Sequence, residues 1–206
     1  MRCRTNKTTG TTAIQLLCLF MVFFLFFVNF SWAVPKPLYG LCYGPFREGQ
    51  SPETGVFPTL AQIQEDLEIL KDTVRSIRTY GNDNILFQIP QLCESYQLEC
   101  YVGSWVSDDA EWNQGVIHRL IQVAEADYSG TRALLVGNEY LLWRAFHYET
   151  TLIDLITQLK AEVELPVSTA EPYHIWLEHP NLAAVVDFIG AHILSLIHIS
   201  EPTRPY

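Results

Sequence analysis

An amide and a carboxylic acid stand side by side at Asn138 and Glu139, one glycine after the apolar run from Ala133 to Val136. A short apolar run of this kind is typical of a strand buried on both faces of a parallel sheet. In a barrel of parallel strands, polar residues at the C-terminal strand ends lie in the active site. Glu139 is therefore a candidate general acid/base for sugar chemistry, with Asn138 as its hydrogen-bonding neighbour. The alternative is that the two residues only cap the following helix.

The elements that would position this pair alternate along the chain. Six short apolar runs are separated by segments in which apolar residues recur at helical spacing, which predicts an α/β fold with a parallel sheet and helices outside it. Thr59 and Gln62 form a capping box, and Asp108 with Glu111 and Thr151 with Asp154 have the same spacing. The six runs are Tyr39 to Tyr43, Val74 to Tyr80, Cys100 to Val106, Ala133 to Val136, Pro166 to Ala170 and Val185 to Leu194.

Strand–helix alternation fits either a closed (β/α)8 barrel or an open doubly wound sheet. No GxGxxG or Walker-type glycine loop follows the first run, which removes the commonest ligand site of open sheets. A barrel also gathers side chains from many strand ends, and polar or aromatic residues stand at the end of nearly every run. We therefore predict a (β/α)8 TIM barrel of which about six βα units are present. The strand-end residues are Tyr43, Arg78, Tyr80, Trp105, Asn138, Glu139, Glu171 and His192.

These residues are typical of a carbohydrate cleft, because sugars stack their C–H faces on aromatic rings and need polar partners for their hydroxyls. Tyr43, Tyr80 and Trp105 are candidate stacking rings, and Trp176 is either another or part of a covering helix from His174 to Leu182. Arg78 is expected to pair with a carboxylate deep in the barrel rather than to reach the cleft. His192 either contacts sugar or is a buried, satisfied histidine.

Charge and cysteine content narrow the ligand class. The formal net charge is −10, and residues 1–33 hold three basic and no acidic residues, so the remainder is more acidic still, at −13. This excludes nucleic acid and anionic surfaces and favours a neutral ligand. No CxxC motif or His/Cys cluster indicates a metal site. Cys42, Cys93 and Cys100 are expected to be small buried hydrophobes, with a Cys93–Cys100 disulfide as the alternative.

Residues 1–33 resemble a secretory leader. Basic residues open the segment, Ala13 to Phe30 is strongly apolar, and Ser31 and Ala33 are small residues at the positions that a signal peptidase reads. An uncleaved membrane anchor is the alternative, since the apolar stretch reaches the lower limit of a membrane span. Either interpretation predicts a secreted or cell-envelope protein. Oligomeric state is not predicted from the sequence.

Four segments together resemble glycoside hydrolase family 17, the β-1,3-glucanases, and most closely its bacterial and fungal branch. They are Leu41 to Arg47, Ile77 to Tyr80, Val136 to Glu139 and Pro166 to Ala170, and the resemblance covers Leu38 to Leu194. It implies a (β/α)8 barrel that hydrolyses or transfers β-1,3-linked glucan with retention. Glu139 would be the acid/base and Asn138 would hold the sugar 2-hydroxyl, and no metal or organic cofactor would be needed.

A retaining enzyme needs a second carboxylate about 5 to 5.5 Å from the first, whose negative charge would help Glu139 keep its proton. The family's nucleophile follows the seventh strand in a Glu-Ser/Thr-Gly-Trp context, which this chain lacks. Glu171 is the nearest substitute, but a subsite or structural role is favoured for it. Asp187 is expected to be structural, at the start of its strand, and Asp108 and Asp109 to cap a helix.

The expected organisation is a leader over 1–33, a partial barrel over 34–194 and a non-family tail over 195–206. The tail resembles the translation of a sequencing adapter, with a genuine C-terminal extension as the alternative. We expect an exported, retaining β-1,3-glucan hydrolase fragment that carries the acid/base but not the nucleophile. Two open sheet edges would make it poorly soluble, and it would not hydrolyse laminarin. The competing functions are a glucan glucanosyltransferase and a non-catalytic glucan-binding envelope protein, although a binder would not need the Asn138–Glu139 pair.

Overall fold

A computed structural model describes residues 38–143 and 148–193 of the chain. The expected leader over 1–33 and the expected tail over 195–206 lie outside the described residues, so both stay predictions. Within the described ranges, no helix combines the length and the apolar character that crossing a membrane requires.

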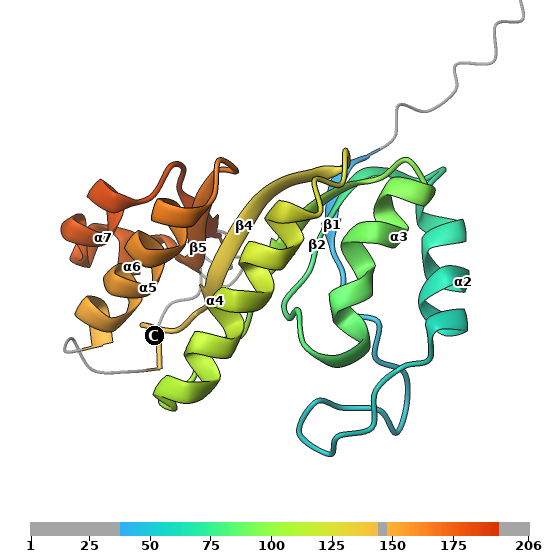
Figure 1. Ribbon diagram of the computed structural model, residues 1–206, viewed down its shortest axis with the longest axis horizontal. Coiled ribbons are helices and arrows are strands. Elements are labelled where there is room, and N and C mark those ends of the chain that lie inside the picture. The colour runs from blue at the N-terminus through green and yellow to red at the C-terminus, as the bar shows by residue number, and fades with distance from the viewer. Residues whose placement is uncertain (1–37, 144–147, 194–206) are drawn as a thin grey trace, which may run out of the picture. The chain divides into compact units, whose positions relative to one another are not determined.

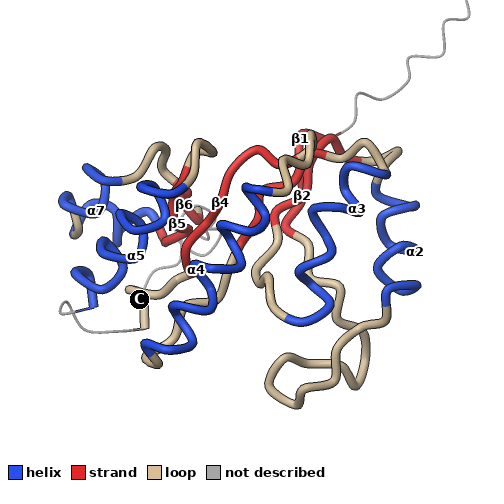
Figure 2. Tube along the Cα trace, in the orientation of Figure 1, coloured by secondary structure: helices blue, strands red, loops and turns tan. Residues whose placement is uncertain are grey.

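Six parallel strands form one sheet whose spatial order follows the order of the sequence (Figures 1 and 2). The sheet curls into a half-barrel, with helices between successive strands, as an incomplete (β/α)8 barrel does. The predicted fold class is therefore confirmed, and the open doubly wound alternative is wrong, because no strand in the described ranges crosses back over another. The strands are β1 (Leu38–Cys42), β2 (Val74–Arg78), β3 (Glu99–Gly103), β4 (Thr131–Asn138), β5 (Val167–Pro172) and β6 (Gly190–His192).

The helices cover the outside of this curved sheet (Figure 1). Thr59 and Gln62 form the predicted capping box in front of α2, with side chain and backbone bonded in both directions. Helix α4 begins at Ala110, and Asp109, one of the two predicted caps, accepts the backbone N–H groups of Glu111 and Trp112 in its first turn. The helices are α2 (Leu60–Leu70), the 3₁₀ helix η1 (Asn84–Gln88), α3 (Ile89–Ser95), α4 (Ala110–Glu125), α5 (Tyr148–Glu162), α6 (Tyr173–Glu178) and α7 (Pro180–Val185).

The sixth strand is much shorter than predicted. The apolar run that begins at Val185 first completes α7, which Pro180 opens at its first turn, and only Gly190–His192 pairs with β5. Asp187 lies before the strand, where it accepts hydrogen bonds from the backbone N–H of Val167 at 2.8 Å and from Lys160 Nζ at 2.6 Å. The Lys160 bond is the main cause that lowers the pKa of Asp187. These contacts agree with the expected structural role.

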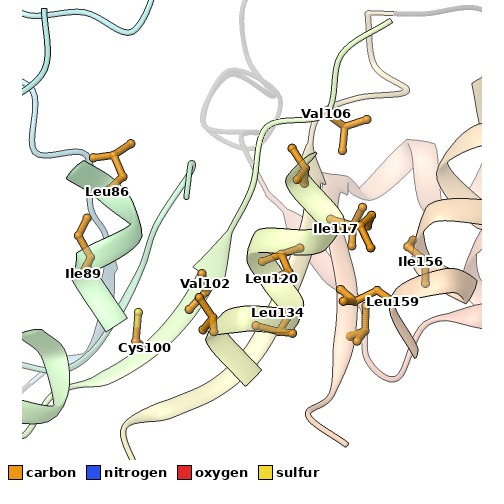
Figure 3. Close-up of a cluster of buried hydrophobic side chains, with 14 of the residues drawn as sticks. Leu86, Ile89, Cys100, Val102, Val106, Ile117, Leu120, Leu134, Ile156 and Leu159 are labelled. Atoms are coloured by element: carbon orange, nitrogen blue, oxygen red, sulfur yellow. The ribbon is translucent and has the colours of Figure 1, made fainter. Parts of the chain in front are cut away.

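Apolar side chains of the helices and the sheet form a continuous core (Figure 3). Leu120 and Ile117 of α4 lie between the sheet residues Val102 and Leu134 and the α5 residues that Figure 3 labels. The helical spacing of Leu120 with Val116 and Val123 predicted this, and all three are buried.

The cysteines follow the prediction only in part. Cys93 and Cys100 are buried and Cys42 is exposed, and all three are free thiols in the structure. Burial of Cys42 was wrongly predicted because β1 forms an edge of the described sheet, where all five of its residues remain exposed.

Removing core volume at Leu120 should destabilise the fold. Leu120 is fully buried, so Leu120→Ala should lower the free energy of unfolding by about 2–5 kcal/mol through lost apolar contact and a residual cavity. Leu177→Ala is the matched control: Leu177 also lies on a helix but is 78% exposed, and its loss should change stability by less than about 0.5 kcal/mol. Denaturant unfolding of both variants checks this, and equal losses would contradict the described core.

Candidate active site

The backbone at the end of β4 leaves regular strand geometry where the candidate acid is placed. The β4–β5 register shifts between Leu135 and Asn138, and Gly137 and Glu139 both have left-handed backbones, with φ of +83° and +52°. For Glu139 this conformation costs of the order of 1 kcal/mol or more. A hydrogen bond of 2.7 Å from the Glu139 backbone N–H to the carbonyl oxygen of Ala170 ties it to β5. Because of this irregularity, the direction of the Glu139 side chain does not follow the regular alternation of side chains along β4.

Glu139 makes its side-chain contact with a histidine of the sixth strand. Its Oε1 lies 2.7 Å from His192 Nδ1, and the two side chains are 18% and 20% exposed. Both are thus partly accessible, and the two groups share one hydrogen bond. The structure brings together two predicted site residues that are 53 positions apart, and it gives His192 a carboxyl partner. The Glu139 carboxyl is thus engaged by β6, and the next described helix, α5, begins only at Tyr148.

Asn138 is held by the second strand. Arg78 Nη2 donates to Asn138 Oδ1 at 2.7 Å, and the Arg78 guanidinium lies 4.4 Å from the centre of the Tyr80 ring. The expected pairing of Arg78 with a carboxylate is therefore wrong: an amide oxygen takes that place. Arg78 holds the amide oxygen and so fixes the orientation of the amide group. In this orientation the amide N–H groups of Asn138 can donate to a sugar hydroxyl.

Glu171 lies at the end of β5 but is covered completely, with no exposed surface. Its Oε1 accepts the backbone N–H of Leu141 at 3.0 Å. The pKa of Glu171 is raised to about 7. Burial is the largest cause of this rise, and the charge of Glu139 adds to it. Hydrogen bonds from backbone N–H groups act in the opposite direction. A sugar cannot reach a fully buried carboxyl, so the expectation that Glu171 contacts substrate is wrong and the structural alternative holds.

A cavity of about 540 Å³ with aromatic walls lies beside Tyr80. Trp105 and Tyr80 are 50% and 39% exposed, as a stacking role requires. Trp112 adds a third ring, and its Nε1 donates to the carbonyl oxygen of Trp105 at 2.8 Å. The cavity is lined by Gly44, Phe46, Pro52, Glu53, Tyr80, Gly81, Asp83, Leu86, Trp105 and Trp112.

Sequence reasoning missed Phe46, Glu53, Asp83 and Trp112. A signal was present for Trp112, which lies in the first turn of α4, directly after the loop that carries Trp105. The start of a helix that follows a strand lies at the same edge of the sheet as the end of that strand. A ring in the first turn of α4 is therefore close to one in the preceding loop.

Two of the candidate stacking rings belong to the core instead. Tyr43 is 8% exposed, and its hydroxyl donates to Asp66 of α2 at 2.9 Å, so its ring turns toward that helix. Burial is the main cause that raises the pKa of Tyr43. Trp176 is 7% exposed and its Nε1 donates to the carbonyl oxygen of Gly190 at 3.2 Å, which makes it part of the covering helix.

In the described part of the chain, no group of three or more His, Cys, Asp or Glu side chains is arranged to hold a metal ion. The groups gathered here are a carboxyl, an imidazole, an amide and exposed aromatic rings. They suit proton transfer to a neutral, hydroxyl-rich ligand.

Comparison with known families gives a match over residues 40–196 to the BtgE/BtgC glycoside hydrolase domain. The chain belongs to this family. This membership confirms the predicted resemblance to glycoside hydrolase family 17. Comparison with the curated proteins gives no match.

Solved structures of low identity share the fold. The glycoside hydrolase family 17 β-1,3-glucanosyltransferase from Rhizomucor miehei is 23% identical with a TM-score of 0.56, over 74% of this chain and 55% of that one. An active-site mutant of the Rhizomucor miehei β-1,3-glucanosyltransferase, in complex with laminaritriose, is 24% identical with a TM-score of 0.57 over the same shares. The endo-laminarinase from Formosa Hel1_33_131 is 20% identical with a TM-score of 0.60, over 74% of this chain and 48% of that one. The chain thus spans about half the length of these proteins.

The buried Glu171 carboxyl should make stability depend on pH. The folded chain holds this proton more tightly than the unfolded chain, so the free energy of unfolding should fall as pH rises from about 4.5 to about 7. Removing this contribution by Glu171→Gln should flatten the pH profile by up to about 3 kcal/mol across that window. Denaturant unfolding at several pH values measures it. The control Glu178→Gln, at an exposed position of α6, should leave the pH dependence of the free energy of unfolding unchanged. If Glu171→Gln also leaves that dependence unchanged, Glu171 is not its source.

Proposed function

We propose that this glycoside hydrolase domain acts on neutral β-1,3-glucan with retention, and that Glu139 is its acid/base. A line of contacts from the aromatic cavity to the acid carries the proposal. Tyr80 lines the cavity and lies against Arg78, Arg78 holds Asn138, and Glu139 follows Asn138 in the chain. A sugar stacked on the cavity's rings would therefore extend toward a carboxyl that is partly accessible.

The Glu139–His192 contact supports a catalytic role for the second carboxyl oxygen. His192 Nδ1 contacts Oε1, so Oε2 would be the oxygen that passes the proton to the glycosidic oxygen. The amide N–H groups of Asn138 would meanwhile donate to the neighbouring sugar hydroxyl. Both groups come from the same strand end, which fixes their separation in advance of binding.

The nucleophile is proposed to lie outside the six described strands. Glu171 is close enough for the charge of Glu139 to affect its pKa, but it has no exposed surface and it holds the Leu141 N–H, so it cannot attack an anomeric carbon. A seventh strand, as in the family resemblance, would supply the second carboxylate at the spacing that retention needs.

Charge supports a neutral substrate. The cavity lining includes the carboxylates of Glu53 and Asp83 and no lysine or arginine, and the chain as a whole is strongly acidic. An anionic polysaccharide would be repelled, whereas carboxylates accept hydrogen bonds from glucose hydroxyls. Two solved proteins of this fold are described by their action on β-1,3-glucan, which supports the same polymer here.

Loss of the exposed rings should weaken glucan binding. Trp105→Ala and Tyr80→Ala should each reduce the affinity for laminaritriose about fivefold or more, because each removes a stacking surface. Titration calorimetry on the 206-residue chain measures this. Tyr39→Ala is the control, since Tyr39 is 68% exposed but lies near the start of β1, at the opposite end of the strand. A trigalacturonate that binds as tightly as laminaritriose, or a control variant that loses as much affinity, would contradict the proposal.

The acid/base role can be tested without the nucleophile. The α-fluoride of laminaribiose presents the anomeric carbon in the configuration of a glycosyl-enzyme. An acceptor hydroxyl oxygen bonds to that carbon, the C–F bond breaks, fluoride leaves, and Glu139 takes the acceptor's proton. The chain should then form β-linked oligosaccharide from this donor and a laminaribiose acceptor.

Glu139→Gln should slow this coupling about a hundredfold, because it removes the base and keeps the shape of the side chain. Fluoride release and product analysis measure the rate, and Glu178→Gln should react like the unchanged chain. No product from the unchanged chain, or an undiminished rate in the Glu139 variant, would refute the role of Glu139.

A further inference from the structure

A buried carboxyl lies directly behind the candidate acid. Glu139, Glu171 and His192 come from the ends of the consecutive strands β4, β5 and β6, and the β5–β6 register pairs Glu171 with Ala191 and Pro172 with His192. Of the three, only Glu171 has no exposed surface. Burying a carboxyl has a large desolvation cost, so its retention at this position needs a physical reason.

The contacts of Glu171 supply that reason. Its Oε1 accepts the Leu141 N–H at 3.0 Å. The backbone N–H groups of Tyr140 and Leu142, on either side of Leu141, also lower the pKa of this carboxyl. The Glu171 side chain is therefore tied to the turn that follows Glu139 and holds that turn in place.

That turn begins at a strained residue. Glu139 has a φ of +52°, which an L-residue adopts only when its surroundings hold it there. Two attachments do so, and both go to β5. The backbone N–H of Glu139 itself is bonded to Ala170, and the following turn is bonded to the Glu171 side chain. Without the second attachment, the acid's side chain would be free to swing away from His192.

We propose that Glu171 is a positioning residue for Glu139: its buried carboxyl accepts the N–H of Leu141 in the turn that follows the acid, and so holds the acid against His192. This inference rests on the proposed acid/base role of Glu139. It assigns Glu171 no contact with sugar.

The test uses substitutions of Glu171 and needs no glucan. Glu171→Ala removes the acceptor, whereas Glu171→Gln keeps an acceptor oxygen for Leu141. Two NMR measurements apply to both variants: amide hydrogen exchange at Leu141, and the chemical shifts of the His192 ring, which report its contact with Glu139. Glu178→Gln is the matched control. Leu134, whose N–H is bonded to Pro166 in the sheet, reports whether the fold is intact.

We expect Glu171→Ala to speed Leu141 exchange at least about tenfold while Leu134 stays protected, because the loss of a buried acceptor opens the turn. We also expect Glu171→Ala to move the His192 ring signals, because the acid leaves its contact with that ring, and Glu171→Gln to keep Leu141 protected, because its amide oxygen accepts the same N–H. Loss of Leu141 protection in a folded Gln variant would overturn the inference even if the Ala variant unfolds. So would unchanged Leu141 exchange in a folded Ala variant.

Failure of this inference differs from failure of the proposed function. A chain that binds no laminaritriose but shows both NMR effects would lose its assigned substrate and keep the positioning role of Glu171. A chain that binds glucan through Trp105 and shows neither effect would keep its substrate and lose that role.

Discussion

The hydrogen bond between the Glu139 backbone N–H and the carbonyl oxygen of Ala170 is the constraint on which the site depends. It joins the end of β4 to β5 at Glu139, whose backbone is left-handed. The direction of the Glu139 side chain is therefore set by the sheet. The parallel pairing of six consecutive strands then places Asn138, Arg78 and His192 around the same strand end. Each of these contacts joins residues far apart in sequence, and the rigid sheet is what makes them meet.

Two neighbouring carboxyls have different roles because their environments differ. Glu139 is partly accessible and touches an imidazole, which suits a group that exchanges protons with a ligand. Glu171 is fully covered and binds backbone N–H groups, which suits a group that holds a turn in place. Burial raises the pKa of Glu171 to about 7, so this support carries a charge that depends on pH near neutrality. Pairs of carboxyls separated in this way by environment are a recurring basis for acid–base chemistry.

The sequence was most informative where one short segment determines the structure. The run that ends in Asn138 and Glu139, the Thr59–Gln62 box and the stripe containing Leu120 all predicted what the structure contains, because strand burial, capping and helix faces are local properties. The ends of elements were less predictable. Val185 belongs to α7 and not to β6, since Pro180 starts a helix that ends at Val185, and the strand begins only at Gly190.

Side-chain direction and burial at strand ends could not be predicted. Tyr43 turns to Asp66 on α2 and Arg78 to Asn138, although both follow strands as active-site residues do. The covering of Glu171 depends on a contact with Leu141, 30 positions away, which no local pattern encodes. Trp112 was not singled out in the sequence, yet the edge shared by α4 and the loop after β3 brings it to the cavity.

The most direct test is a crystal structure of the chain with laminaritriose bound. The account predicts a glucose ring stacked on Trp105 or Tyr80 and a glycosidic oxygen about 3 Å from Glu139 Oε2, within hydrogen-bond distance. An oligosaccharide bound at the opposite end of the strands, or one whose linkages all lie out of reach of Glu139, would contradict it.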